Sequence, residues 1–251
     1  MRVESKTIMI ASGKGGTGKS TVAVLLGSRL AALHKKVLLI ELDSGLRSVD
    51  IISGVYGKTV YDVGDVLCGR CDGSKAVVES PIYPGLHIIS APYEGGEVPP
   101  EALKLLTDRM SDYFDYLILD TAAGMGMPFQ AAAAVSDIAL LVQTPDPVAL
   151  RDGRIVADAL FDMGVHQIRL VVNRLNSRSF RSGAVKDLDE CIDTVGAQLI
   201  AVIPESMDLL QASSSGTALP ETGMAFAALD RLAARLEGRR VPLAVPRSGV
   251  T

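Results

Sequence analysis

Nine residues near the N-terminus, from Gly13 to Thr21, combine four glycines with two lysines and three hydroxyl side chains. Their sequence, GKGGTGKST, matches the phosphate-loop pattern G-x-x-x-x-G-K-[ST] in full. An apolar run, 7–11, precedes the loop, and apolar residues at helical spacing follow it, so the motif lies between a predicted strand and a predicted helix. We expect backbone N–H groups and the helix N-terminus to attract phosphate oxygens. The residues expected to contact a nucleotide here are Gly13, Lys14, Gly15, Gly16, Thr17, Gly18, Lys19, Ser20 and Thr21.

Two side chains of this loop have specific expected tasks. Lys19 is placed to reach the β- and γ-phosphates, and the Ser20 hydroxyl is placed to ligate Mg²⁺. Lys14 is a second lysine that the pattern does not require. Because Lys19 already serves the phosphates, a cation at this position suits a contact outside its own site, such as a nucleotide held by a facing subunit.

Residues 14–21 read KGGTGKST, and here the chain resembles the MinD/ParA family of deviant P-loop ATPases, whose signature is K-G-G-x-G-K-[ST]. The resemblance covers residues 6–237, which is nearly the whole chain, and it is strongest to the MinD branch of the family. It implies a homodimer that closes around two ATP molecules, with Lys14 as a catalytic lysine acting across the interface. It also implies slow hydrolysis that a further partner accelerates.

Two carboxylates, Glu41 and Asp43, follow an apolar run that begins at Val37. Period-two alternation sends both to the same side of a strand. Segment 41–47, ELDSGLR, resembles the D-x-D-x-G-L-R-like segment of the MinD branch. This resemblance implies that Asp43 lies beside the γ-phosphate and positions the attacking water. The family usually has Asp in place of Glu41, whose longer arm can alter the Mg²⁺ shell. The alternative is that both acids cap the following turn.

Segment 115–124, DYLILDTAAG, is an apolar strand that ends in an acid, a Walker B arrangement. We expect Asp120 to hold the Mg²⁺ shell, directly or through water. The resemblance implies that the backbone at Gly124 approaches the γ-phosphate. Ala122 stands where the family usually has proline, which predicts a softer loop.

The base of the nucleotide is expected on the other side of the loop. Asn173 ends an apolar strand, and its amide offers both a donor and an acceptor, as an adenine edge requires. The resemblance places the adenine contact at Asn173, a wall for the ring at Pro204, and a backbone contact near Glu205. The alternatives are a strand-end turn residue at Asn173 and a plain surface acid at Glu205.

Segment 143–152 resembles a MinD segment that borders the dimer interface and the partner-binding surface. A structural interpretation explains the same residues: Pro145 and Pro147 end a strand, and Asp146 caps the next helix. Segment 125–128, MGMP, departs from the MinD pattern, which carries an acid after the glycine.

Two further clusters carry weaker signals. Cys68 and Cys71 form a C-x-x-C pair without a second pair, so one chain supplies only two of the four ligands of a zinc or iron–sulfur site, and inert thiols are favoured. A metal bridged across a dimer and redox chemistry are the alternatives. Four basic residues share one serine-rich stretch, which favours a solvated loop over DNA binding: Arg174, Arg178, Arg181 and Lys186.

Length and composition fit one α/β domain. The chain has 251 residues, 48% of them hydrophobic, and a net charge of −4. Apolar strands alternate with amphipathic helices, which predicts a doubly wound, mainly parallel β-sheet with helices on both faces, of the MinD-like P-loop class. Strands are expected at 7–11, 37–42, 86–90, 116–120, 138–142, 168–173 and 199–203, and helices at 100–110, 148–163 and 224–237. The expected organisation is one ATPase domain, 1–238, and a flexible C-terminal tail, 239–251.

Together these signals predict a cytoplasmic MinD-like ATPase that uses ATP/ADP and Mg²⁺ and positions a partner protein in cell-division site selection. No signal-peptide core precedes residue 7, and the longest apolar stretch, 131–142, is too short to span a bilayer. MinD proteins bind the membrane through a C-terminal amphipathic helix, which the proline-interrupted tail lacks, so membrane attachment at the inner face of the cell membrane stays open. The alternatives are a soluble switch for a flagellar, secretion or chemosensory cargo, plasmid or chromosome partition, and metal-centre maturation.

Overall fold

The computed structural model describes residues 5–45, 47–95, 97–176, 178–181 and 183–243. Leu46, Ser177, Ser182 and the end of the predicted tail, 244–251, lie outside the described residues. Residues 239–243 form neither helix nor strand. None of the helices in the described ranges is both long enough and apolar enough to cross a membrane.

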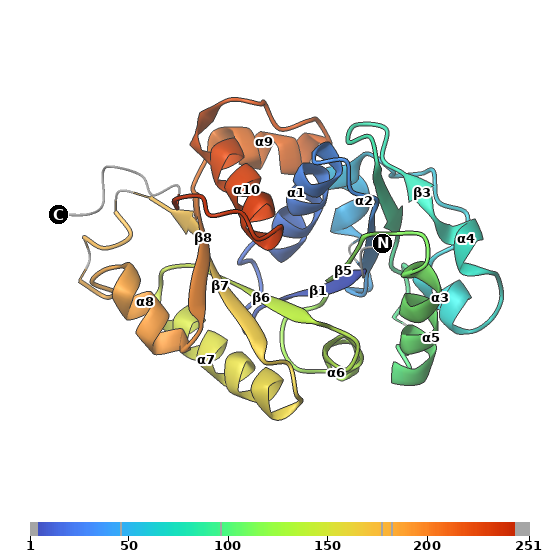
Figure 1. Cartoon of the computed structure of the whole chain (residues 1–251), viewed down its shortest axis with the longest axis horizontal. Coiled ribbons are helices and arrows are strands. Elements are labelled where there is room, and N and C mark those ends of the chain that lie inside the picture. Colours follow the sequence, from blue (N-terminus) through green and yellow to red (C-terminus); the bar gives the residue numbers. More distant parts are fainter. Residues whose placement is uncertain (1–4, 46, 96, 177, 182, 244–251) are drawn as a thin grey trace.

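Eight strands form one sheet in the order β3-β4-β2-β5-β1-β6-β7-β8 (Figure 1). The strands are β1 (Lys6–Ala11), β2 (Val37–Glu41), β3 (Val78–Glu79), β4 (Leu86–Ile89), β5 (Tyr116–Asp120), β6 (Ile138–Gln143), β7 (Gln167–Leu175) and β8 (Gln198–Pro204). All pairs are parallel except β3 with β4. The predicted doubly wound fold is confirmed. The sequence did not reveal β3, because two residues are too few to show a period.

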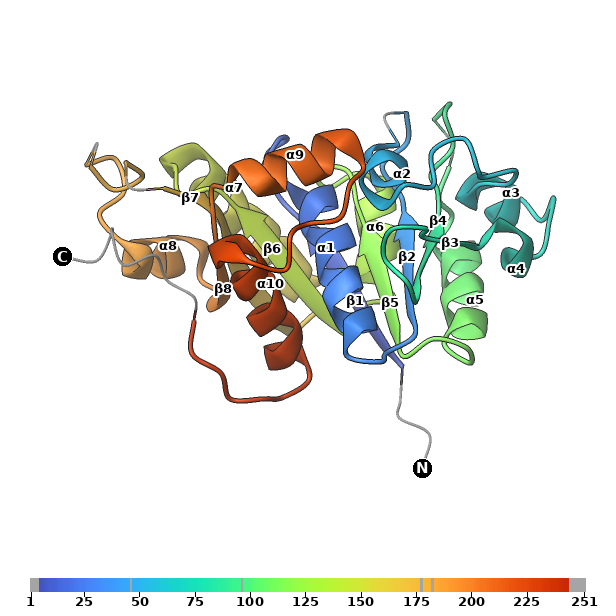
Figure 2. The ribbon, with the colours of Figure 1, turned by 90° about the horizontal axis from the view of Figure 1, so that it is seen from above.

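Ten helices cover the sheet in the described part of the chain. They are α1 (Lys19–Ala32), α2 (Ser48–Ser53), α3 (Val63–Leu67), α4 (Gly73–Ala76), α5 (Pro100–Met110), α6 (Met127–Ala133), α7 (Pro147–Asp162), α8 (Leu188–Val195), α9 (Met207–Ser215) and α10 (Gly223–Leu236). Helices α1, α2, α9 and α10 lie on one face, as Figures 1 and 2 show. The remaining helices pack on the other face.

The side chains of β1 show why both faces are apolar. Ile8 and Ile10 enter the core beneath α1 and α10, whereas Met9 and Ala11 enter the core beneath α6 and α7. Alternate residues therefore serve different layers, and a central strand has no polar face.

Strand β1 is the point at which the order of strands reverses, because it pairs with β5 on one side and β6 on the other. In sheets of this type a ligand site lies beyond the carboxyl ends of the strands at such a reversal. The glycine-rich loop, 12–18, follows β1 at that edge.

Candidate functional site

The glycine-rich loop packs tightly against two neighbouring segments. Gly16 and Gly18 have φ of 78° and 95°, a left-handed conformation that suits glycine. A Cβ at Gly18 would lie 2.4 Å from Nδ2 of Asn173, and one at Gly13 would lie 2.6 Å from the backbone of Asp152. A side chain at position 13 would therefore displace α7 from the loop, and one at position 18 would displace the Asn173 amide.

Lys19, the first residue of α1, is buried under this loop. Its Nζ donates a hydrogen bond to Ser12 Oγ at 3.1 Å. Burial lowers the pKa of the ammonium, while the carboxylates of Asp120 and Asp43 act in the opposite direction. Lys19 therefore lies at a place where the negative charges of Asp120 and Asp43 converge.

Asp120, the last residue of β5, is fully buried, and neither carboxylate oxygen has a hydrogen-bond partner among the described residues. Burial raises the pKa of Asp120 to about 7, and the nearby Ser20 hydroxyl and Lys19 ammonium oppose that rise. Ser20 thus lies close to the carboxylate without completing a hydrogen bond of ordinary geometry. An unpartnered buried carboxylate is costly, and the cost is relieved when a cation binds.

The donors present fit Mg²⁺. The Ser20 hydroxyl and the Asp120 carboxylate are hard oxygen ligands, and Mg²⁺ is commonly held by one or two protein oxygens together with substrate phosphates and water. No group of three or more His, Cys, Asp or Glu side chains within the described ranges could hold a metal ion alone.

The prediction that Glu41 and Asp43 lie on the same face of a strand is wrong. Strand β2 ends at Glu41, so strand alternation does not extend to Asp43. The buried carboxylate of Glu41 accepts hydrogen bonds from the backbone N–H groups of Val49 at 3.2 Å and Ala91 at 3.3 Å. Val49 lies in the first turn of α2, so Glu41 joins the end of β2 to the N-terminus of that helix. Burial raises the pKa of Glu41 to about 8, against the effect of these hydrogen bonds.

Asp43 is partly buried and lies close enough to Lys19 and Asp120 to influence the pKa of each. Gly124, with φ of 92°, donates its N–H to the carbonyl of Ser12 at 3.3 Å. The loop after β5 therefore contacts the glycine-rich loop. The water-orienting role of Asp43 and the phosphate contact at Gly124 stay predictions.

Asn173 is buried at the end of β7, and its Nδ2 donates a 2.7 Å hydrogen bond to the carbonyl of Thr17. The amide therefore holds the glycine-rich loop in place, a contact that sequence reasoning missed because it depends on the order of strands. The acceptor oxygen is not used in this bond. The predicted adenine contact remains a prediction.

A cavity of about 440 Å³ opens beside Asn173. It is lined by Gly18 and Thr21 of the phosphate-loop segment, by Pro204 and Glu205 at the end of β8, and by residues of α9 that the sequence did not indicate. The Glu205 carboxylate accepts a hydrogen bond from Asn176 Nδ2 at 2.8 Å. The structure thus gathers the expected base-side residues around one hollow large enough for a nucleoside.

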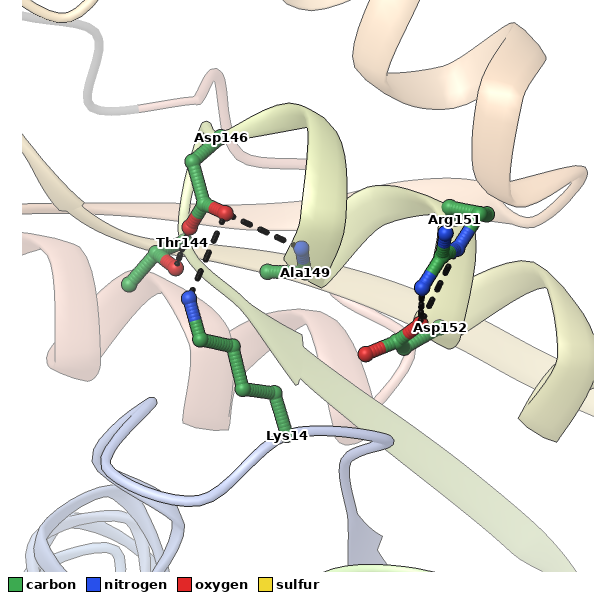
Figure 3. A network of polar contacts seen from close by, with 6 residues as sticks. All are labelled: Lys14, Thr144, Asp146, Ala149, Arg151 and Asp152. Carbon is green, nitrogen blue, oxygen red and sulfur yellow. Dashed lines mark hydrogen bonds and ion pairs between the residues drawn. The ribbon is translucent and has the colours of Figure 1, made fainter.

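Lys14 points from the loop toward the start of α7 (Figure 3). Its Nζ lies 3.5 Å from Oδ1 of Asp146, and both side chains are exposed. Asp146 also accepts the N–H of Ala149 at 3.0 Å, so the predicted helix-capping role is confirmed. Arg151 and Asp152 form a separate ion pair at 3.0 Å, one turn further along α7. The cross-subunit role of Lys14 stays a prediction.

Residues outside this edge do not join the site. Cys68 is exposed, Cys71 is partly buried, and both are free thiols. A hollow of about 900 Å³ between α3, α4 and α5 includes Cys71 and His87 in its lining but none of the predicted site residues. It is larger than the cavity at Asn173, but size alone does not outweigh the unpartnered carboxylate and buried lysine beside the glycine-rich loop.

Comparisons with known proteins agree with this geometry. Residues 8–219 match the CobQ/CobB/MinD/ParA nucleotide binding domain. The septum site-determining protein MinD of Bacillus subtilis is 32% identical over 246 residues, which cover 96% of this chain and 92% of the relative. The MinD of Thermotoga maritima is 32% identical over 242 residues, which cover 94% and 89%.

Solved structures give the same result. The chain superposes on a chain of the MinC:MinD cell division protein complex of Aquifex aeolicus with a TM-score of 0.88 and 33% identity, covering 98% of this chain and 100% of that one. For the MinD cell division protein of the same organism the TM-score is 0.86 at 33% identity, with 95% and 99% covered. The chain therefore belongs to the CobQ/CobB/MinD/ParA nucleotide-binding domain family, within its MinD/ParA group of P-loop ATPases.

Proposed function

We propose that this protein is a MinD-like ATPase switch that binds ATP with Mg²⁺, pairs with a second copy around two nucleotides, and resets when ATP is hydrolysed. The observation that carries the proposal is the buried, unpartnered carboxylate of Asp120 beside Lys19 and Ser20. A ligand-free chain that leaves this group unsatisfied gains most when a cation and phosphates arrive together.

Each side chain then has a task in the reaction. The loop N–H groups and Lys19 hold the β- and γ-phosphates, and Ser20 with Asp120 holds Mg²⁺. Bound Mg²⁺ neutralises charge that develops on the phosphate oxygens. Asp43 orients the attacking water from beside Lys19. No arginine is assigned to the transferred phosphate, so Lys14 of the partner subunit supplies the missing charge, and hydrolysis stays slow until a dimer and a further partner are present.

The names of the relatives support a cell-division role. Two MinD proteins at 32% identity are named septum site-determining proteins, and the Aquifex aeolicus structure joins MinC with MinD. We therefore assign this chain to the positioning of a partner protein in division-site selection, with a homodimer as the active form.

Light scattering on a sizing column tests the switch. Asp43→Ala should bind ATP and accumulate as a dimer, because hydrolysis is blocked, and it should be a monomer in ADP. Lys19→Ala, the matched control, should bind neither nucleotide and stay monomeric. A monomeric Asp43→Ala protein in ATP would remove the proposed role of Asp43, and unchanged ATP binding by Lys19→Ala would overturn the site.

Co-sedimentation of Asp43→Ala with anionic liposomes, in ATP against ADP, tests the cellular role. Pelleting in ATP alone supports division-site selection at a membrane. A protein that dimerises in ATP but stays in the supernatant in both nucleotides favours the alternative, a switch that positions a soluble flagellar, secretion or chemosensory cargo.

A further inference from the structure

Four arginines surround one hollow at the end of the sheet opposite the glycine-rich loop. The hollow has a volume of about 470 Å³ and is lined by Arg169, Arg235, Arg239 and Arg240. The other described residues of its lining are uncharged. A chain whose net charge is −4 thus concentrates positive charge at this place.

Three separate segments bring these arginines together. Arg169 is the third residue of β7, and Arg235 lies in the last turn of α10. Helix α10 ends in a Schellman motif: Gly238, with φ of 78°, donates its N–H to Arg235 O at 2.9 Å, and Arg239 donates to Ala234 O at 3.0 Å. After this turn the chain runs back toward β8, as Figure 2 shows. Arg239 and Arg240 line the hollow together with the first residues of β8.

These arginines lack the acidic partners that others in the protein have. Arginines elsewhere form ion pairs, for example Arg70 with Asp65 at 2.6 Å. Within the described ranges no carboxylate pairs with any of the four arginines of the hollow. Arg169 donates one hydrogen bond to the carbonyl of Ile168 at 2.9 Å, and Arg235 donates one to Ile200 at 3.4 Å. A guanidinium has five N–H donors, so most remain available.

Stabilisation of α10 does not account for the cluster. A cation in the last turn of a helix interacts favourably with the helix dipole, which explains Arg235. Arg169 belongs to a strand on another part of the chain, and Arg240 lies beyond the turn that ends the helix. They converge without a counter-charge among the described residues, and an anion satisfies such an arrangement.

We propose that this hollow, the arginine pocket, binds a phosphate-bearing anion. The planar fork of arginine matches phosphate oxygens in pairs, and several forks around a concave surface suit a compact, multiply charged group. Strand β8, with seven residues, separates this pocket from the nucleotide edge by roughly 20 Å. The arginine pocket is therefore a second anion site, and it does not depend on the proposed ATPase function.

Calorimetric titration with pyrophosphate tests this proposal on full-length Lys19→Ala protein, in which the glycine-rich loop is disabled. The pocket variant is Arg239→Gln/Arg240→Gln, because both side chains are exposed and the fold does not depend on them. The matched control is Arg178→Gln/Arg181→Gln, two exposed arginines outside the pocket. We expect the pocket variant to bind pyrophosphate about 10- to 100-fold more weakly than its parent and the control to be unchanged.

The same affinity in the pocket variant and its parent, or an equal loss in the control, would overturn the arginine pocket. If Lys19→Ala melts below the wild type, the wild-type protein gives the same answer: the pocket variant should remove one of two pyrophosphate sites. Retention of both sites contradicts the proposal. These outcomes are independent of ATP hydrolysis.

Vesicles distinguish the source of the phosphate. Phosphatidylglycerol vesicles are compared with phosphatidylcholine vesicles in co-sedimentation with the wild type and the pocket variant. Pyrophosphate binding without vesicle binding assigns the pocket to a soluble anion. Binding to phosphatidylglycerol that the pocket variant loses assigns it to a lipid headgroup, and loss of neither ligand in the variant rejects the site.

Discussion

Glu41 and Asp120 end neighbouring strands, β2 and β5, and pair directly in register. Both carboxylates are buried, and burial raises the pKa of each, to about 8 for Glu41 and about 7 for Asp120. Their oxygens have opposite surroundings. Glu41 accepts one backbone N–H on each oxygen, whereas Asp120 accepts none from the described residues.

This difference in hydrogen bonding distinguishes Glu41, which has a structural role, from Asp120, which is available to a ligand. Glu41 joins the end of β2 to α2 through Val49 and to the segment after β4 through Ala91. Asp120 joins nothing within the described chain and lies beside Lys19 and Ser20. Two acids one strand apart can thus be told apart by where their hydrogen bonds go, although both are buried and both have raised pKa values.

Asp120→Asn gives the largest expected effect. Without the carboxylate, the gain in ATP affinity that Mg²⁺ provides should fall about 10- to 100-fold, measured by titration with and without Mg²⁺. The ligand-free protein should become more stable by about 1–3 kcal/mol at pH 8 in urea unfolding, because the penalty of burying a carboxylate without hydrogen-bond partners exceeds its attraction to Lys19. A loss of ligand-free stability would show that Asp120 has partners within the chain and would end the contrast with Glu41.

Glu41→Gln should do the reverse at pH 6. The amide nitrogen of glutamine cannot accept the N–H that one oxygen of the carboxyl group accepts, so the free energy of unfolding should fall by about 1–3 kcal/mol. The dependence of ATP affinity on Mg²⁺ should change much less than in Asp120→Asn. Equal losses of Mg²⁺ dependence in both variants would contradict the separation of roles.

The pH dependence of Glu41→Gln sharpens this test. The folded pKa of Glu41, about 8, lies above its ordinary value of 4.5, so the folded chain keeps a proton that the unfolded chain releases. The contribution of the Glu41 carboxyl group to the free energy of unfolding is fully present below pH 4.5 and is lost as the pH rises through 8. The deficit of Glu41→Gln should therefore shrink or reverse at pH 9. A deficit that is the same at both pH values would place the Glu41 pKa near its ordinary range.

Asn173→Ala should have a smaller effect. Loss of the 2.7 Å bond to Thr17 should cost about 1 kcal/mol of stability and weaken ATP binding roughly 10-fold. Comparison of ATP with GTP separates two roles of the amide. If Asn173 reads adenine, the preference for ATP should fall; if it only supports the loop, both nucleotides should weaken equally.

Lys14→Ala should affect the fold least. Its ion pair with Asp146 is exposed, with 46% and 38% of the two side chains accessible, so the unfolding free energy should change by less than about 0.5 kcal/mol. ATP should still bind, while ATPase activity in a phosphate-release assay is lost. Normal turnover would remove the case for a lysine that acts across a dimer.

Local patterns predicted much of this molecule. The glycine-rich loop was found because its chemistry is encoded by spacing within nine residues, and the bounds of β5 and α5 match the predicted ones because apolar runs and a proline mark them. The sequence could not show that Glu41 bonds to Val49 and Ala91, because those contacts require the order of strands. The arginine pocket was missed for the same reason: Arg169 and Arg235 meet only after β7, β8 and α10 have packed.

The central place of β1 also sets the order in which the protein can fold. Residues 6–11 are synthesised long before their two neighbours in the sheet, residues 116–120 and 138–143. Pairing between segments so far apart in the chain is slow, because the long intervening loop must lose conformational entropy before any stabilising contact forms. The strands on both sides of the glycine-rich loop therefore form only after more than half of the chain has left the ribosome. A nucleotide can therefore stabilise this protein only after β5 and β6 have paired with β1.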